Sequence, residues 1–327
     1  MRKSLLSCLM VIVLSAPITA VLAQNIGCTA SLPPRLIVGQ EGRVLYDNTV
    51  NLRTEPGIGM TIINPITWGS MFTVLDGPRC VDDYNWWRID YHDETDGVVG
   101  WIAEGDASEY WLEARGRRQL IEDSFGQERY YVVASDGAME PEGCLELPDD
   151  YTRVSVGFAQ LNARTLFMLD HASTLYAMQG GSGSLRSRIT QGSYTGGAEA
   201  ASFGTHDGGG AVDLSVRDTI HGRVLADVEE LVYALRVAGF AAWVREPGLF
   251  YPNSPVHIHA IALGDQELSE AARLQIGGPG GYLRGLDGLI AQYGGPRPDQ
   301  HGGPVICQWM LDVLGITNLA ELAPADG

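Results

Sequence analysis

Positive charge is scarce in this sequence. Its 327 residues include 22 lysines and arginines against 40 aspartates and glutamates, which gives a formal net charge of -18. Proteins that bind nucleic acid neutralise phosphates with clustered basic side chains, so this balance argues against a nucleic-acid partner. The acidity fits the solubility of an exported protein.

Apolar runs long enough to span a bilayer are also missing, because the longest one falls short of the ~20 residues that a membrane helix needs. That run, Leu5–Leu14, follows a basic start and precedes small residues. We therefore expect residues 1–23 to be a secretory signal peptide, with no membrane span in the mature protein. A lipid anchor on Cys28 is a weaker alternative, since Asn25 stands where a lipoprotein signal has an aliphatic residue.

Cysteines are few, and none of the five has the spacing of a zinc finger. Cys8 leaves with the signal, so an even set remains for an oxidising compartment, which predicts two disulfides. Four cysteines allow three pairings. The domain boundaries favour Cys28 with Cys80 and Cys144 with Cys307, because each bridge then closes one module.

The length predicts two domains, since about 300 residues exceed what one hydrophobic core usually serves. Residues 28–112 contain short apolar runs broken by Gly, Pro, Asn and Asp, a pattern typical of a small all-β unit. Residues 113–130 are rich in Arg, Glu and Gln and indicate a polar connector or a short exposed helix. Residues 131–327 mix helical and strand periods and predict an α+β domain.

Three landmarks in the first unit occur in a recognisable order. They are an arginine strand with its turn at 50–57, "WWRI" at 86–89 and "GWIAEG" at 100–105. Together they resemble a bacterial SH3-like domain. The resemblance implies a small β-barrel that helps hold a wall hydrolase near peptidoglycan or a partner peptide. We also expect Trp86 or Trp87, together with Trp101, to fill at least part of so small a core.

Periodic apolar patterns predict two helices and one strand in the second unit. Apolar residues from Phe158 to Tyr176, and again from Val224 to Leu235, recur at helical spacing, and Gly239 stops the second stripe. The alternating "VHIHAIAL" at 256–263 predicts a buried central strand that reaches an active-site edge.

Four side chains in this unit suggest a metal site. Glycines join His206 to Asp213, which lets the chain turn tightly so that both side chains can converge. His257 and His259 lie two apart on the expected strand, so they point to the same face. Imidazole nitrogens with a carboxylate suit Zn²⁺. Three ligands would leave a position for catalytic water, whereas all four would make a closed structural site.

The same segments resemble the zinc peptidases grouped with the D-alanyl-D-alanine carboxypeptidases, the murein endopeptidase and the hedgehog fold. The first motif of that group is SxHxxGxAxD, and this chain matches it at four positions: His206, Gly209, Ala211 and Asp213. Its serine position is Gly204 here, and Ser202 lies two residues further back.

The resemblance implies a role for each candidate. His206, Asp213 and His259 would bind zinc, and His257 would act as the general base. In other members a glutamate a few residues before the last ligand is the base. Glu246 precedes His259 by thirteen residues and is a weaker alternative.

Family members also carry an arginine before the His/Asp motif, where it holds a substrate carboxylate or the oxyanion. Arg186 and Arg188 are the candidates here, since a guanidinium can bind a carboxylate with two hydrogen bonds. The family arginine tends to follow a Gly-Tyr pair, and this chain has Thr195 after Tyr194.

The sequence thus predicts a secreted zinc metallopeptidase that hydrolyses peptide bonds of peptidoglycan, as a D,D- or L,D-type carboxypeptidase or endopeptidase. The expected catalytic domain is an antiparallel sheet with flanking helices. Two alternatives remain open. One is a non-catalytic cell-wall-binding protein with a degenerate peptidase fold, and the other is a zinc amidase that cleaves between sugar and peptide.

Overall fold

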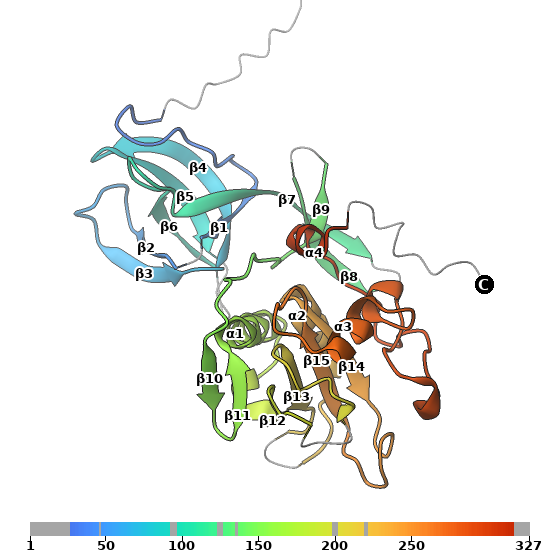
Figure 1. Ribbon diagram of the computed structural model, residues 1–327. Coiled ribbons are helices and arrows are strands. Elements are labelled where there is room, and N and C mark those ends of the chain that lie inside the picture. The colour runs from blue at the N-terminus through green and yellow to red at the C-terminus, as the bar shows by residue number, and fades with distance from the viewer. Residues whose placement is uncertain are drawn as a thin grey trace, which may run out of the picture.

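The computed structural model describes residues 27–45, 47–91, 97–122, 127–134, 137–197, 202–218 and 222–316, and the expected signal segment 1–23 lies outside them. The chain forms mainly antiparallel sheets with a few helices (Figure 1). This agrees with the expected α+β class. Within the described ranges, no helix has the length and apolar character needed to cross a membrane.

A nine-stranded antiparallel sheet contains the first unit. Its strands are β1 Glu41–Val44, β2 Thr49–Arg53, β3 Ile62–Thr67, β4 Met71–Val81, β5 Tyr84–Tyr91, β6 Val98–Ala103, β7 Leu112–Glu122, β8 Glu128–Val133 and β9 Met139–Pro141. They pair in the order β3-β2-β6-β5-β4-β1-β7-β8-β9. This order has two free ends, so the pairing among the described strands does not close into the expected barrel.

The tryptophans of β5 and β6 fill the core of this unit, as expected. Trp87 is fully buried, and its indole N–H donates to the Glu104 carboxylate at 2.8 Å, which meets the need of a buried indole for a partner. Trp86 and Trp101 form a second buried cluster beside it with Ala103.

The described residues of the expected connector, 113–122 and 127–130, form neither a linker nor a helix. Most of it belongs to strands β7 and β8, which pair with each other and extend the sheet beyond β1. Some of its charged residues are paired rather than solvated: Arg118 binds Glu142 at 2.9 Å and its guanidinium lies 3.5 Å from the Tyr130 ring centroid. Arg115 likewise pairs with Glu140.

The second unit is built on a four-stranded antiparallel sheet of order β12-β13-β15-β14, with a separate β10-β11 hairpin. The strands are β10 Arg153–Val156, β11 Ala159–Asn162, β12 Ile189–Gln191, β13 Ala211–Ser215, β14 Phe240–Arg245 and β15 His257–Ala262. The helices are α1 Ala163–Met178, α2 Val228–Val237, α3 Glu270–Gly277 and α4 Gln308–Leu314, with short 3-10 turns η1 Leu185–Arg188, η3 Tyr282–Arg284 and η4 Ala291–Tyr293.

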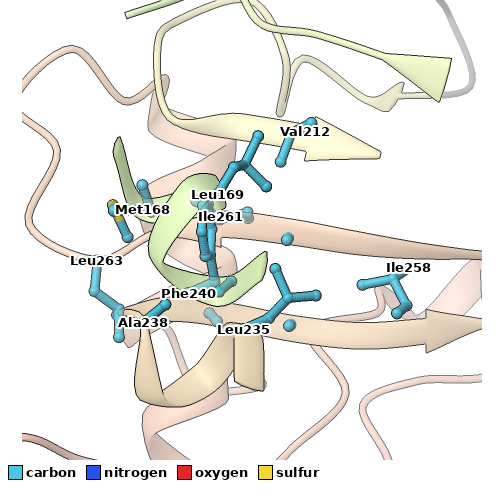
Figure 2. Close-up of a cluster of buried hydrophobic side chains, with 14 of the residues drawn as sticks. Met168, Leu169, Val212, Leu235, Ala238, Phe240, Ile258, Ile261 and Leu263 are labelled. Carbon is cyan, nitrogen blue, oxygen red and sulfur yellow. The ribbon is translucent and has the colours of Figure 1, made fainter. Parts of the chain in front are cut away.

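Helices α1 and α2 pack on one face of this sheet (Figure 2). Leu169 of α1, Leu235 of α2 and the strand residue Ile258 belong to one buried cluster, and all three are fully buried. Because successive strand residues alternate between faces, His257 and His259 point away from this core. The expected central strand is thus confirmed, and its second face is free to carry a site.

Both expected helices exist, with later starts. Phe158 is 78% exposed and lies outside α1, which begins after Asn162; the Asn162 side chain accepts from the Thr165 N–H at 2.8 Å and caps the helix. Helix α2 begins at Val228, and Gly239, with a φ of +106°, follows its end as expected.

The favoured disulfide pairing is confirmed. Cys28 is bonded to Cys80 and Cys144 to Cys307. A cysteine engaged in a disulfide cannot carry a thioether-linked lipid, so the lipid-anchor alternative for Cys28 is wrong in this structure. Two disulfides fit a protein of an oxidising compartment.

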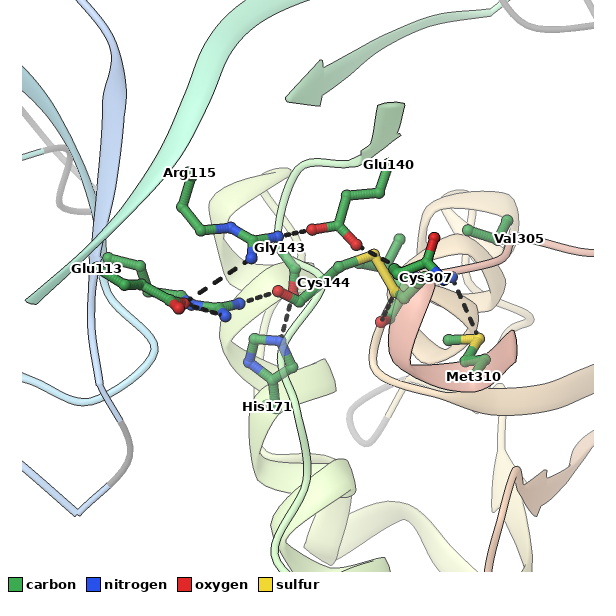
Figure 3. The surroundings of a disulfide bond; sticks show 12 residues. Glu113, Arg115, Glu140, Gly143, Cys144, His171, Val305, Cys307 and Met310 are labelled. Carbon is green, nitrogen blue, oxygen red and sulfur yellow. Dashed lines mark hydrogen bonds and ion pairs between the residues drawn. A yellow bond between two sulfur atoms is a disulfide. The ribbon is translucent and has the colours of Figure 1, made fainter. Parts of the chain in front are cut away.

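The Cys144–Cys307 bridge links the segment after β9 to the start of α4 (Figure 3). Glu140 lies beside it and pairs with Arg115 of β7, while His171 of α1 contacts the Gly143 carbonyl oxygen at 2.7 Å. We call Glu140, Cys144 and Cys307 the disulfide seam.

Candidate metal centre

The glycine-rich segment before β13 brings His206 to the sheet. A Cβ added at Gly208 would lie 2.2 Å from the Glu267 carbonyl oxygen, so no larger residue fits there without a shift of the backbone. Gly210 has a φ of +77°, in the left-handed region that favours glycine. These two positions let the chain fold back so that His206 is packed beside the strands, with 1% of its surface exposed.

Strand register supplies the other two members of the site. Asp213 of β13 lies directly opposite His259 of β15, and Trp243 of β14 lies on the other side of His259. The Trp243 and His259 rings are nearly parallel, with centroids 6.2 Å apart and an interplanar angle of 12°. The indole therefore holds the imidazole from one side while Asp213 contacts it from the other.

The three predicted ligands converge. Oδ1 of Asp213 lies 2.7 Å from Nδ1 of His259 and 3.3 Å from Nε2 of His206, and the two imidazole nitrogens are 3.3 Å apart. Candidate ligand atoms of all three residues lie within 4.8 Å of one another. We call these residues the histidine cluster.

The donor set of the histidine cluster fits a zinc ion. Nδ1 of His206 lies 2.9 Å from the Gly192 carbonyl oxygen, which can only accept, so this nitrogen carries a proton. In the neutral ring Nε2 then presents a lone pair toward the cluster. Such a backbone contact to the distal nitrogen is the usual way in which a ligating imidazole is oriented. Two imidazole nitrogens and a carboxylate match the ligands of catalytic zinc sites.

Burial and mutual contacts set the charges of the cluster. Burial lowers the pKa of His259 to about 4, so its ring is neutral at pH 7 and able to bind metal. Burial alone would raise the pKa of Asp213, but His206 and His259 hold it well below its usual range. Burial would also lower the pKa of His206, and the Asp213 charge raises it instead.

His257 lies beside the cluster rather than in it. Its Nε2 is 3.9 Å from Oδ2 of Asp213, and its Nδ1 is 2.9 Å from the Pro255 carbonyl oxygen. That contact places the proton on Nδ1 and leaves Nε2 of the neutral ring as a proton acceptor that faces the cluster. Glu246, the weaker candidate base, is exposed and is not among the described residues that line the cleft.

A cleft of about 250 Å³ opens beside the cluster. It is lined by Thr190, Gln191, Ser202, Phe203, Thr205, His206, Asp213, Arg245, Phe250, Tyr251, Ser254, Pro255, His257, His259 and Gln275. Two of its lining rings pack against Tyr293, whose centroid lies 5.0 Å from that of Phe203 and 5.2 Å from that of Phe250. The cleft therefore offers an apolar wall next to a polar centre, as small-molecule and peptide sites commonly do.

The backbone explains the missing serine of the first motif. Gly204 has a φ of +79°, so a serine side chain at this position would be strained. Ser202 lines the cleft instead, and its hydroxyl accepts from the Gln191 amide at 2.7 Å.

Neither predicted arginine reaches the cleft. Arg186 forms a surface ion pair with Asp170, in which Nε lies 2.7 Å from the carboxylate. Arg188 is buried and donates to the carbonyl oxygens of Arg217 and Ser182, both at 3.2 Å. Among the described lining residues there is neither Arg186 nor Arg188, so their expected substrate role lacks support from the geometry.

The cleft holds a different arginine that the sequence analysis missed. Arg245 ends β14 directly opposite His257 and is only 2% exposed. Strand alternation could have found it, because Arg245 stands two positions after Trp243 and so shares the face of the site. Ser254 and Gln275, also missed, come from a loop and from α3, and no periodic signal marks them.

Comparison with protein-family models, curated proteins and solved structures finds no match for this chain. The geometry of the histidine cluster and the motif resemblance are therefore what points to a function.

Proposed function

We propose that the protein is a secreted zinc metallopeptidase that hydrolyses peptide bonds of peptidoglycan. The observation that carries this proposal is the convergence of His206, Asp213 and His259 within 4.8 Å at the edge of an open cleft. Three protein ligands beside an accessible space is the arrangement of catalytic rather than structural zinc sites.

The chain's own residues supply the remaining chemistry. His206 through Nε2, His259 through Nδ1 and the Asp213 carboxylate would hold the ion. When bound, zinc polarises a carbonyl and makes water a nucleophile near neutral pH. His257 accepts the proton of the attacking water at Nε2 and returns it to the leaving amine. The Pro255 carbonyl oxygen fixes the His257 ring in the tautomer that this transfer requires.

Three further features support the location and the substrate class. The N-terminal sequence resembles a secretory signal, and two disulfides fit an oxidising compartment. The strands of residues 28–112 carry the landmarks of SH3-like domains, and we assign to this unit the task of holding the enzyme near the wall.

The first test is the metal content of the purified mature protein, with His206→Ala and His259→Ala as variants. We expect about one zinc per chain in the wild type and none in either variant. A wild type that stays metal-free when zinc is offered would refute the peptidase and favour a wall-binding protein.

The second test is digestion of purified peptidoglycan followed by mass analysis. A new peptide terminus is the expected product. Free lactyl groups would show an amidase that cleaves between sugar and peptide, and an unchanged polymer would favour the non-catalytic alternative.

A further inference from the structure

Arg245 differs from the other buried arginines of this unit in how few of its donors are used. Arg236 is equally buried, and each of its three nitrogens donates to Ala242, Gly303 or Asp299 oxygens. Arg245 makes one hydrogen bond, from Nη1 to the Asp287 carbonyl oxygen at 2.7 Å. Its Nε and Nη2 atoms have no partner among the described residues.

Such an arrangement is costly unless a ligand completes it. A buried donor without a partner destabilises the fold, and the more so when it is charged. Burial lowers the pKa of Arg245 only to about 10, so the guanidinium keeps its charge at neutral pH. The side chain lines the cleft, and Nε with Nη2 forms the edge of the guanidinium that binds a carboxylate with two parallel hydrogen bonds.

Two more unsatisfied groups stand at the same cleft. Ser254 is 2% exposed, and its Oγ has no partner within the described part of the chain. Oε1 of Gln275 likewise has no hydrogen-bond partner among the described residues. Ser254 and Gln275 both line the cleft with Arg245. One cation, one hydroxyl and one amide are a set suited to an anion that also carries a hydrogen-bond donor.

We propose that Arg245, with Ser254, binds a carboxylate of the peptide substrate; this inference rests on the proposed peptidase function. The Arg245–His257 pair lies two strand positions from the Trp243–His259 pair, a step of about 7 Å. A carboxylate at Arg245 therefore belongs to a substrate residue one or two positions from the bond that is cleaved. A free C-terminus at that distance makes the enzyme a carboxypeptidase, whereas an acidic side chain would permit internal cleavage.

Calorimetric binding of three probes to the mature protein tests this proposal. The probes are N-acetyl-D-alanine, its C-terminal amide, and the α-amide of N-acetyl-D-glutamate, which has only a side-chain carboxylate. Each is measured with zinc-loaded and with metal-stripped protein, because zinc itself attracts carboxylates. We expect at least one acid to bind about 10- to 100-fold more tightly than the amide in both forms. The preferred acid identifies the source of the carboxylate.

Variants connect this preference to the arginine. Arg245→Gln should abolish the preference, Arg245→Lys should retain part of it, and Arg164→Gln, a buried arginine outside the cleft, should leave it intact. Equal binding of acids and amide, no binding of either acid, or a preference that survives in Arg245→Gln would overturn the proposal. If Arg245→Gln does not fold by circular dichroism, the wild-type comparison and Arg245→Lys still decide.

The outcomes separate this proposal from the function on which it rests. If the protein binds the acid more tightly than the amide but leaves peptidoglycan intact, the carboxylate site is supported and the peptidase function is refuted. A peptidase that cleaves acid and amide peptides equally well, with Arg245→Gln fully active, retains the function and refutes the carboxylate site.

Discussion

The histidine cluster and the disulfide seam bring potential metal ligands equally close together, yet their atoms are not equally free to bind. Both sets have ligand atoms within 4.8 Å of one another. In the seam the two sulfur atoms are bonded to each other, and Glu140 is paired with Arg115. A disulfide sulfur is not a thiolate and is no zinc ligand. In the histidine cluster, one nitrogen of each of two imidazoles faces an ionised carboxylate.

One buried histidine beside the seam and one in the histidine cluster, His171 and His206, have pKa shifts of opposite direction. His171, beside the seam, contacts the Gly143 carbonyl oxygen, and burial lowers its pKa to about 4. His206 is as deeply buried, but the Asp213 carboxylate overcomes the effect of burial and raises its pKa. Proximity of ligand types therefore does not define a metal site; the chemical state of each atom and the charge beside it do.

The largest expected effect is on zinc content and kcat, and it separates His206→Ala in the histidine cluster from Glu140→Gln in the disulfide seam. Loss of an imidazole should remove zinc and lower kcat by about 1,000-fold or more, because the metal supplies several kcal/mol of transition-state stabilisation. Glu140→Gln should keep about one zinc per chain, measured by elemental analysis of the purified proteins. Zinc loss in Glu140→Gln with retention in His206→Ala would reverse the comparison.

The seam should matter for stability instead. The Cys144–Cys307 bridge joins residues 163 positions apart, and the double variant Cys144→Ala/Cys307→Ala should unfold about 5 kcal/mol more easily in urea, since the bridge restricts the unfolded chain. Zinc content per folded chain should not change. The control is Cys28→Ala/Cys80→Ala. It removes a bridge between residues 52 positions apart and should lose less stability, because the shorter loop restricts the unfolded chain less. A drop in zinc content of the first variant alone would show that the seam supports the metal centre.

A smaller effect on kcat is expected from His257→Gln. Glutamine is polar and similar in size to histidine, but it cannot act as a base. We expect kcat to fall by about 100- to 1,000-fold while zinc remains near one per chain. Activity on peptidoglycan peptides and elemental analysis of the same sample give both values. Loss of zinc in this variant would instead identify His257 as a fourth ligand and the site as closed and structural.

The scaffold was predictable where a short-range period or motif determines the structure. The alternation of 256–263 indicated strand β15, and the stripe ending before Gly239 indicated α2. The segment 113–130 was not predictable in this way. Its charges look solvated in sequence, and only strand pairing brings Arg118 to Glu142 and makes them part of a sheet.

The site shows the same division. His206, Asp213 and His259 could be grouped from the glycine turn and the strand period, and the register confirms that they meet. The arginine of the cleft could not be identified by the same reasoning. Arg186 pairs with a surface carboxylate and Arg188 donates to backbone carbonyl oxygens, and neither preference is visible in the sequence. Which arginine lines the cleft depends on the pairing of β14 with β15, a long-range contact.

The opposite treatment of the two histidines predicts the pH dependence of stability. The pKa of His171 in the folded protein, about 4, is below its ordinary value of 6.5, so folding favours the neutral ring. Its contribution is fully present above pH 6.5 and is lost as the pH falls toward 4, by about 3 kcal/mol at most. His206, whose pKa is raised, contributes with the opposite sign and loses its contribution as the pH rises. His171→Gln should therefore flatten the fall in urea stability between pH 6.5 and 4, and parallel losses in wild type and variant would show that another group causes the fall.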